Sequence, residues 1–395
     1  MKKRIYFDYE TTTPVDPRVK REMERFWSKD FGNPSSIHKE GVTAKTALDS
    51  ARKNMALILN CKPEELIFTS GGTESNNLAI FGCINKLIEN GARYSDLHLI
   101  ASSIEHSSVL EVFKELEKLG AKVDFVGVNK EGIIKLSELQ TKMRHNTTLV
   151  SVIYANNEIG TIQPIHKISN LIKDVTARSG GKSAKPIFHV DASQAPLYLD
   201  INRDKLGADM ITIDGQKIYG PKGIGLLYKS KNVDIKPILF GGGQERGLRP
   251  GTENIPLMVG FASALAIASV NRKKETARLI KLRDYFISSL QKMFIGIIIN
   301  GSLTERLPNN INFSYPGLDA EFAVLKLDAY GIACSTKSAC MEGEEDSYVI
   351  KALRRDEFSA KSTLRFSLGR ATTKEEIDST LKSLKRILDG VDSTS

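Results

Sequence analysis

One stretch of the sequence decides the fold: Ile213-Asp214-Gly215-Gln216-Lys217-Ile218-Tyr219-Gly220-Pro221-Lys222-Gly223-Ile224-Gly225. An apolar run over residues 208–213 leads into it, and a second apolar run over residues 224–228 leads out of it. The glycines and the proline between the two runs predict a turn, so we expect a strand, a loop and a second strand.

Lys217 lies just after the first of these strands. A lysine that is partly desolvated at such a position has a lowered pKa and a nucleophilic amine, which is what Schiff-base formation requires. Taken alone, the residue is more typical of an exposed lysine in a hairpin. Its role therefore depends on which other segments the fold brings beside it.

Two upstream segments supply candidate neighbours. Residues 69–74 pass from a predicted strand through two glycines into a predicted helix, whose free N–H groups suit a phosphate. Residues 189–194 follow a predicted buried strand and contain a carboxylate. A pyridoxal phosphate site requires a phosphate cradle, a carboxylate for the ring nitrogen and a Schiff-base lysine. These roles would be filled, in chain order, by Gly72 with Thr73, by Asp191 and by Lys217.

Further motifs extend over the whole chain. They are Tyr6-Phe7-Asp8-Tyr9, Thr12-Thr13-Pro14-Val15-Asp16-Pro17, Gly32-Asn33-Pro34-Ser35-Ser36, Glu105-His106, Asn156-Asn157-Glu158-Ile159-Gly160, Gly241-Gly242-Gly243-Gln244-Glu245-Arg246-Gly247-Leu248-Arg249, Ser338-Ala339-Cys340 and Leu364-Arg365-Phe366-Ser367-Leu368-Gly369-Arg370. Together they resemble the cysteine desulfurase family of the NifS and IscS group. That family belongs to the class V aminotransferases among the fold-type I pyridoxal phosphate enzymes.

The resemblance implies a reaction and partners. L-cysteine would be converted to L-alanine with pyridoxal 5'-phosphate as cofactor, leaving a persulfide on Cys340. The sulfur would pass to acceptor proteins, such as an iron–sulfur scaffold or a tRNA thiolation enzyme. A homodimer with shared active sites is also implied, because Thr252 matches a residue that reaches the phosphate of the partner subunit.

The resemblance also implies roles for individual residues. Lys217 would be the Schiff-base lysine and a proton shuttle, and His106 would stack on the cofactor ring and move protons. Asp191 would keep the ring nitrogen protonated. The remaining cofactor contacts would come from Gly72, Thr73, Asn157, Gln194, Gln216 and Thr252, and the substrate carboxylate would be held by Asn33 and Arg365.

Two of these residues also carry an argument from their own surroundings. Arg365 alternates with apolar neighbours on a predicted strand, so it can clamp a carboxylate with two parallel hydrogen bonds or form a structural ion pair. Cys340 lies in the polar segment 335–346, where a thiol is expected to be exposed. Its activation requires a lowered pKa or a nearby proton acceptor, and Lys337 would help while the following acidic residues would hinder.

Strand and helix patterns alternate from residue 67 onward. They predict an α/β fold with a mostly parallel, doubly wound sheet, whose strand C-terminal ends gather the ligand-binding residues. A long helical pattern from Pro256 then leads to a smaller α+β unit. We expect an N-terminal arm and large cofactor-binding domain over residues 1–256, and a linking helix and small C-terminal domain over residues 257–395.

Composition excludes some other functions. The formal charge is +9 over 395 residues, but Lys and Arg are interleaved with Asp and Glu, so direct binding to nucleic acid is not expected. The longest apolar run, residues 257–270, is too short to span a bilayer, and the N-terminus shows no signal-peptide core. The four cysteines have no metal-ligand spacing, so we expect no metal site and a cytoplasmic protein with reduced thiols.

The sequence departs from the family pattern close to Lys217. Asp214 and Gln216 stand where the family has a serine and a histidine that donate to the cofactor phosphate. Gln216 can still donate, whereas an ionised Asp214 accepts only and would repel a phosphate. We therefore expect weaker cofactor binding, unless Asp214 turns away or is protonated. Further departures are Glu10, Gln244 and Lys337.

Other functions remain open at this stage. A different pyridoxal phosphate enzyme, such as an aminotransferase or a selenocysteine lyase, would use the same cofactor site, but an aminotransferase has no use for a thiol at position 340. A non-catalytic scaffold protein of the same family is the other alternative. The presence of Lys217, Asp191, His106, Arg365 and Cys340 argues against it.

Overall fold

The computed structural model describes residues 4–178, 185–336, 346–353 and 360–392. Most of them form a large α/β unit around a seven-stranded sheet with the strand order β2-β8-β7-β6-β5-β3-β4. Its strands are β2 (Leu66–Thr69), β3 (His98–Ser102), β4 (Lys122–Val126), β5 (Thr147–Ile153), β6 (Ile187–Asp191), β7 (Met210–Asp214) and β8 (Gly225–Lys229). Strand β8 runs antiparallel to β2 and β7, whereas β3–β7 pair in parallel.

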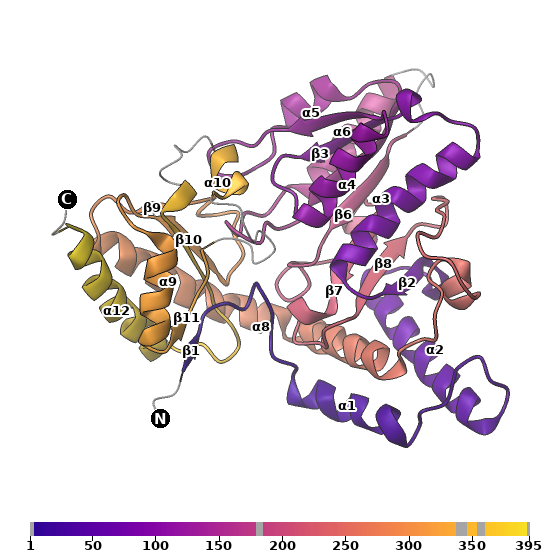
Figure 1. Cartoon of the computed structure of the whole chain (residues 1–395), viewed down its shortest axis with the longest axis horizontal. Coiled ribbons are helices and arrows are strands. Elements are labelled where there is room, and N and C mark those ends of the chain that lie inside the picture. Colours follow the sequence, from indigo (N-terminus) through magenta and orange to yellow (C-terminus); the bar gives the residue numbers. More distant parts are fainter. Residues whose placement is uncertain (1–3, 179–184, 337–345, 354–359, 393–395) are drawn as a thin grey trace.

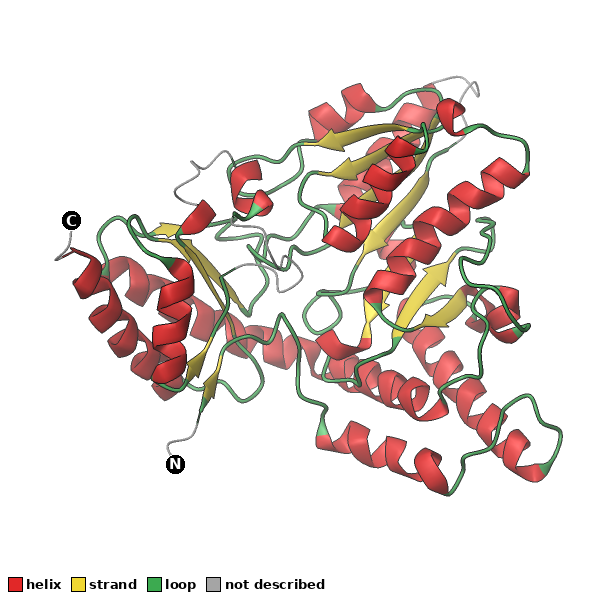
Figure 2. Cartoon of the chain, viewed as in Figure 1, coloured by secondary structure: helices red, strands yellow, loops and turns green. Residues whose placement is uncertain are grey.

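Helices cover both faces of this sheet (Figure 2). They are α1 (Pro17–Ser28), α2 (Lys39–Leu59), α3 (Gly72–Glu89), α4 (Ser107–Lys118), α5 (Leu136–Lys142), α6 (Ile165–Arg178), α7 (Arg203–Leu206) and the 39-residue α8 (Ile255–Met293). Neighbouring residues of β2 pack into hydrophobic cores on opposite faces of the sheet. Ile67 packs with α3 and α4, while Leu66 and Phe68 pack with α2, α6 and α8. Burial on both faces explains why these strands, apart from the partly exposed β4, are largely apolar in the sequence.

Helix α8 extends from the large sheet into a smaller C-terminal unit (Figure 1). That unit contains the antiparallel sheet β12-β10-β9 and, beside it, the parallel pair β1-β11. Its elements are β9 (Ile298–Ile299), β10 (Asn310–Ser314), α9 (Ala320–Ala329), β11 (Ile332–Ala333), α10 (Tyr348–Ala352), β12 (Thr363–Ser367) and α12 (Lys374–Asp392). Strand β1 (Ile5–Tyr6) comes from the N-terminal arm, so the arm belongs to the same unit as α12.

The fold confirms the predicted architecture of a mostly parallel, doubly wound sheet followed by a smaller α+β unit. The exception in strand direction is β8, which leaves the quoted glycine-rich turn and returns between β2 and β7. Glycine at position 225 allows this return, because a Cβ there would lie 2.5 Å from the backbone carbonyl carbon of Gly71. The division between residues 256 and 257 stays a prediction.

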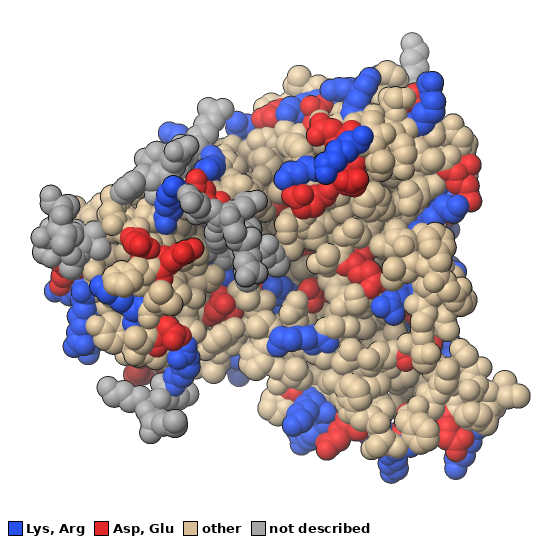
Figure 3. Space-filling model, viewed as in Figure 1, with Lys and Arg blue, Asp and Glu red and all other residues tan. Residues whose placement is uncertain are grey.

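Helix α8 is also the one helix among the described residues that is long and apolar enough to cross a bilayer by length and composition. Half of its most apolar window is buried inside the protein, where the helix packs against α1 and α2. A core helix passes the same test, so the observation is weak support for a membrane span. On the face shown in Figure 3, basic and acidic side chains are interspersed, which agrees with their interleaving in the sequence.

Candidate active site

A cavity of about 380 Å³ lies where the C-terminal ends of β5, β6 and β7 meet the N-termini of α3 and α4. The N-terminal arm and β12 of the C-terminal unit complete its wall, through Glu10 and Arg365 respectively. Nine of the predicted site residues line this cavity: Gly72, Thr73, His106, Asn157, Asp191, Gln194, Gln216, Lys217 and Arg365. Residues separated by almost 300 positions in the chain are thus brought to one place.

Lys217 ends a single 3-10 turn, η3 (Gly215–Lys217), that follows β7 directly. Its Nζ donates to the backbone carbonyl oxygens of Glu10 at 2.8 Å and of Thr11 at 2.7 Å. The arm also fixes the turn itself, because the hydroxyl of Thr13 donates to the carbonyl oxygen of Gln216 at 2.7 Å. The loop quoted at the outset is therefore held in place by residues 10–13.

Asp191 ends β6 and is 4% exposed. Its Oδ1 accepts from the backbone N–H and the hydroxyl of Ser193, and its Oδ2 accepts from Nδ2 of Asn76 at 2.8 Å. A carboxylate offers about four acceptor positions, so one remains for a ring N–H in the cavity. Beneath it, burial lowers the pKa of His189 to about 4, so this imidazole is neutral near pH 7.

The end of the cavity where the phosphate is predicted to bind contains the carboxylate of Asp214. Helix α3 begins at Gly72, whose N–H points at Oδ2 of Asp214 over 3.4 Å. The same carboxylate accepts from the backbone N–H of Gln216 at 3.1 Å and from its Nε2 at 3.3 Å. Asp214 does not turn away from the cradle. It accepts the hydrogen bonds that a bound phosphate would need.

His106 is the N-cap of α4 and lines the cavity. Its Nδ1 accepts the backbone N–H of Ser108 at 3.1 Å and lies 2.8 Å from that residue's hydroxyl. An Nδ1 that accepts a hydrogen bond leaves the proton of a neutral imidazole on Nε2.

Gln194 donates from its side-chain amide nitrogen, Nε2, to the carbonyl oxygen of Glu10 at 3.0 Å.

Arg365 enters the cavity wall from β12 and is 1% exposed. Its Nη2 donates to Oδ1 of Asp8 at 2.9 Å and to the hydroxyl of Thr11 at 2.7 Å. Its Nη1 donates to the carbonyl oxygen of Asn157 at 2.7 Å. Nε has no hydrogen-bond partner among the described residues. The ion pair of the second sequence interpretation is present, and Nε is a donor that the described residues leave unused, whereas the binding of a substrate carboxylate at Arg365 stays a prediction.

Three predicted site residues are not part of this arrangement. Asn33 and Thr252 are exposed and do not line the cavity of this chain, so their predicted contacts stay predictions. Asn33 instead accepts the backbone N–H of Ser35 at 2.9 Å. Cys340 and Lys337 lie outside the described residues, and the structure does not test their roles.

The structure adds site residues that the sequence did not reveal. Asn76 orients Asp191 from 115 positions away, and Ser193 binds the same carboxylate. Asp8 lay inside a recognised motif, but its partner Arg365 is 357 positions distant. No sequence pattern indicated a role for Thr11 in the site. Ser193 alone was foreseeable, because a serine two residues after a strand-ending aspartate commonly bonds that carboxylate.

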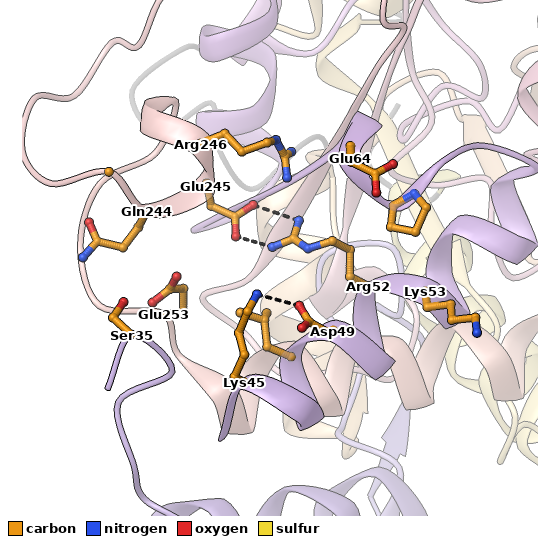
Figure 4. Close-up of a pocket in the computed structure, with 13 residues that line it drawn as sticks. Ser35, Lys45, Asp49, Arg52, Lys53, Glu64, Gln244, Glu245, Arg246 and Glu253 are labelled. Atoms are coloured by element: carbon orange, nitrogen blue, oxygen red, sulfur yellow. Dashed lines mark hydrogen bonds and ion pairs between the residues drawn. The ribbon is translucent and has the colours of Figure 1, made fainter. Parts of the chain in front are cut away.

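A larger, more open cavity of about 680 Å³ lies elsewhere, between α2 and residues 243–253 (Figure 4). It is dominated by the ion pair between Arg52 and Glu245, with Lys45 and Asp49 pairing beside it. Neither Lys217 nor Asp191 borders it, so it is not the place of the predicted chemistry. No cluster of three or more potential metal ligands occurs in the described ranges.

The smaller cavity thus combines a helix N-terminus, a buried carboxylate and a lysine amine, in a protein of fold-type I architecture. Apart from Asp214, this donor set fits pyridoxal phosphate: N–H groups at the start of α3, a carboxylate for the ring nitrogen, and the amine of Lys217. The site defines a pyridoxal phosphate enzyme.

Comparison with known proteins agrees. Residues 5–380 match the family Aminotransferase class-V. The chain is 41% identical over 390 residues to cysteine desulfurase IscS of Dictyoglomus turgidum, covering 98% of this chain and 95% of that protein. It is 41% identical to cysteine desulfurase IscS 1 of Archaeoglobus fulgidus over 391 residues, covering 99% and 98%. A solved NifS-like protein superposes with a TM-score of 0.89 at 36% identity, covering 98% and 99%. The chain belongs to the class-V aminotransferase family, in its cysteine desulfurase branch.

Proposed function

We propose that this protein removes sulfur from L-cysteine. The C–S bond of the substrate breaks, an S–S bond forms with the thiol of Cys340, and L-alanine leaves, so that atoms balance between cysteine plus thiol and alanine plus persulfide. The observation that supports this most directly is the convergence of Lys217, Asp191 and Arg365 on one cavity. A solved relative, SspA, is described in complex with cysteine and is 34% identical, with a TM-score of 0.77 over 92% of this chain and 98% of that one.

The residues of the cavity divide the work. When bound, pyridoxal phosphate supplies an electron sink for the bonds around the α-carbon of an amino acid. Lys217 would hold it covalently and afterwards move a proton with the freed amine. Asp191 would accept the ring N–H, and His106 would offer the proton on its Nε2. The substrate carboxylate would bind to the Nε edge of Arg365.

The finer features remain part of the proposal. Sulfur would pass from Cys340 to an iron–sulfur scaffold or a tRNA thiolation enzyme. Thr252 is exposed, which is compatible with a contact to a partner copy in a homodimer, and Asn33 would contact the substrate carboxylate. A cytoplasmic location accords with free cysteines at 61, 83 and 334. One relative, 38% identical, is a mitosomal cysteine desulfurase of Trachipleistophora hominis, so the compartment differs within the family.

The test uses purified protein loaded with pyridoxal phosphate. We expect Lys217→Ala to abolish the visible absorbance of the covalently held cofactor and to lower alanine formation by at least about a thousandfold. Lys222→Ala is the matched control, because Lys222 lines the same cavity and is exposed. An absorption spectrum measures the bound cofactor, and an alanine assay after addition of L-cysteine measures the activity.

A second pair of variants tests the thiol. Cys340→Ala should abolish alanine formation while the cofactor spectrum is retained. Cys334→Ala should not, because Cys334 is buried and burial raises the pKa of its thiol to about 12. Persistent alanine formation in Cys340→Ala would contradict the desulfurase, and cofactor-dependent transfer of the amino group to a keto acid would indicate an aminotransferase.

A further inference from the structure

Glu10 is the most unusual group in the cavity wall. Its side chain is fully buried, and its backbone is fixed from both units of the protein. The N–H donates to the hydroxyl of Ser367 on β12, and the carbonyl oxygen accepts from Lys217 and Gln194 of the large unit. The carboxyl group is consequently held in a defined position at the junction of the two units.

The carboxyl group of Glu10 is only half satisfied. Its Oε2 accepts from Nδ2 of Asn310 at 2.8 Å and lies 3.9 Å from Nε of Arg365. Its Oε1 has no hydrogen-bond partner within the part of the chain that the structure describes, and the same is true of Arg365 Nε. Among the described residues, Oε1 of Glu10 and Nε of Arg365 are thus both unsatisfied, and the 3.9 Å between that Nε and the other carboxyl oxygen, Oε2, is too long for a hydrogen bond.

Other charged groups surround this pair. Arg306, which precedes β10, and Asp8 of the arm both act on Glu10, and Glu158 acts on Arg365. Tyr198 is a further titratable neighbour of Glu10. The net result is that burial, the largest effect, raises the pKa of Glu10 from 4.5 to about 7, against the lowering effect of Arg365. Glu10 therefore changes protonation state near neutral pH.

We propose that Glu10 couples the binding of a carboxylate at Arg365 to the uptake of one proton. The inference rests on the proposed function, since it takes the Nε edge of Arg365 as the site of the substrate carboxylate. A further carboxylate brought to this guanidinium would share it with Asp8 and with ionised Glu10, and carboxylates crowded at one site cannot all remain ionised without a large cost. A proton taken from solvent onto Oε1 of Glu10 removes the repulsion.

The proposal predicts how the affinity for a carboxylate ligand changes with pH. Below about pH 7 Glu10 is already protonated, so a carboxylate ligand binds without proton uptake. Above that pH, binding must bring a proton with it, and the affinity falls as protons become scarce. For one coupled proton and a free pKa of about 7, the dissociation constant rises about tenfold between about pH 6 and about pH 8.

The experiment titrates the holoenzyme with propionate, a carboxylate that lacks the amine needed to react with the cofactor. Calorimetry at about pH 8, in buffers of different ionisation heat, counts the protons taken up. We expect uptake approaching one proton in the wild type and none in Glu10→Gln, which keeps an acceptor for Asn310. The wild type at about pH 6 should take up little, and this comparison needs no variant.

Glu105→Gln is the matched control. Glu105 is also fully buried, and burial raises its pKa to about 8, but it bonds to Ser102 and the N–H of Ile153 and not to Arg365. Its replacement should leave the proton count unchanged. Proton uptake that persists in Glu10→Gln, or is missing in the wild type at about pH 8, would overturn the inference alone. A failure of propionate to bind at any pH would overturn it together with the assigned role of Arg365.

Discussion

The two ends of the active-site cavity are each suited to an anion, and each already contains a carboxylate of the chain itself. At the α3 end, Asp214 accepts hydrogen bonds from Gly72 and Gln216. At the β12 end, Glu10 faces Arg365 with one oxygen unsatisfied. The first carboxylate is supported by donors that belong to an anion site, whereas the second is buried without enough of them.

This difference determines how each end can admit an outside anion. Asp214 would have to be displaced from its donors before a phosphate could use them, so we expect it to lower the affinity for the cofactor. Glu10 need not move, because its pKa of about 7 allows it to be neutralised by a proton. At the α3 end, Asp214 thus competes with the incoming anion for hydrogen-bond donors. At the β12 end, Glu10 loses its negative charge by binding a proton.

The largest effect is expected when the cation at the β12 end, Arg365, is removed. Arg365→Met leaves the fully buried Glu10 and the partly buried Asp8 without their cationic partner, so we expect a loss of about 3–5 kcal/mol in the free energy of unfolding and no propionate binding. Urea unfolding measures the first and calorimetry the second. Arg52→Met breaks another buried pair, with Glu245, and should lose stability while binding propionate normally. Unchanged unfolding of Arg365→Met would refute the assignment.

A smaller effect isolates Glu10. Its pKa is raised on folding from 4.5 to about 7, so the stability that its neutral form provides is complete below about pH 4.5 and is lost as pH rises through about 7. Glu10→Gln should therefore be more stable than the wild type at about pH 8, by about 3 kcal/mol at most, and equally stable at about pH 4.5. Thermal or urea unfolding across this range measures the gap. A gap independent of pH would show that Glu10 does not titrate there.

The smallest effect concerns the other end. Asp214→Ser removes the competing carboxylate and restores the hydroxyl of the family pattern. We expect it to lower the dissociation constant of pyridoxal phosphate about tenfold, because a carboxylate next to a phosphate costs on the order of 1–2 kcal/mol even when well solvated. Titration of the apoprotein by fluorescence measures it. Asp49→Ser, at an exposed acid paired with Lys45, is the control. An affinity unaltered by Asp214→Ser would mean that Asp214 moves aside freely.

Much of the fold and part of the site could be predicted from the sequence. The strands of the sheet other than β4 are buried on both faces, so they appear as largely apolar runs between turn residues, and all the strands expected from residue 67 onward are present. Lys217, Asp191 and Gly72 follow such runs directly, which places them at one edge of the sheet. The antiparallel return of β8 follows from the expected strand, turn and strand, because the loop between β7 and β8 is too short for a parallel crossover. Its place between β2 and β7 could not be predicted, because an apolar run does not encode its neighbours in the sheet.

By itself, the sequence determined the elements, the family and the residues that end strands, because these depend on local periodicity and motifs. Only the tertiary structure decided what surrounds each charge. Nothing local to Glu10 indicates that it is buried 3.9 Å from Arg365, 355 positions away, or that Asp214 lies on the N–H of Gly72. Burial and the distances between charges set pKa values and hydrogen-bond competition, and both are properties of residues that become neighbours only when the chain has folded.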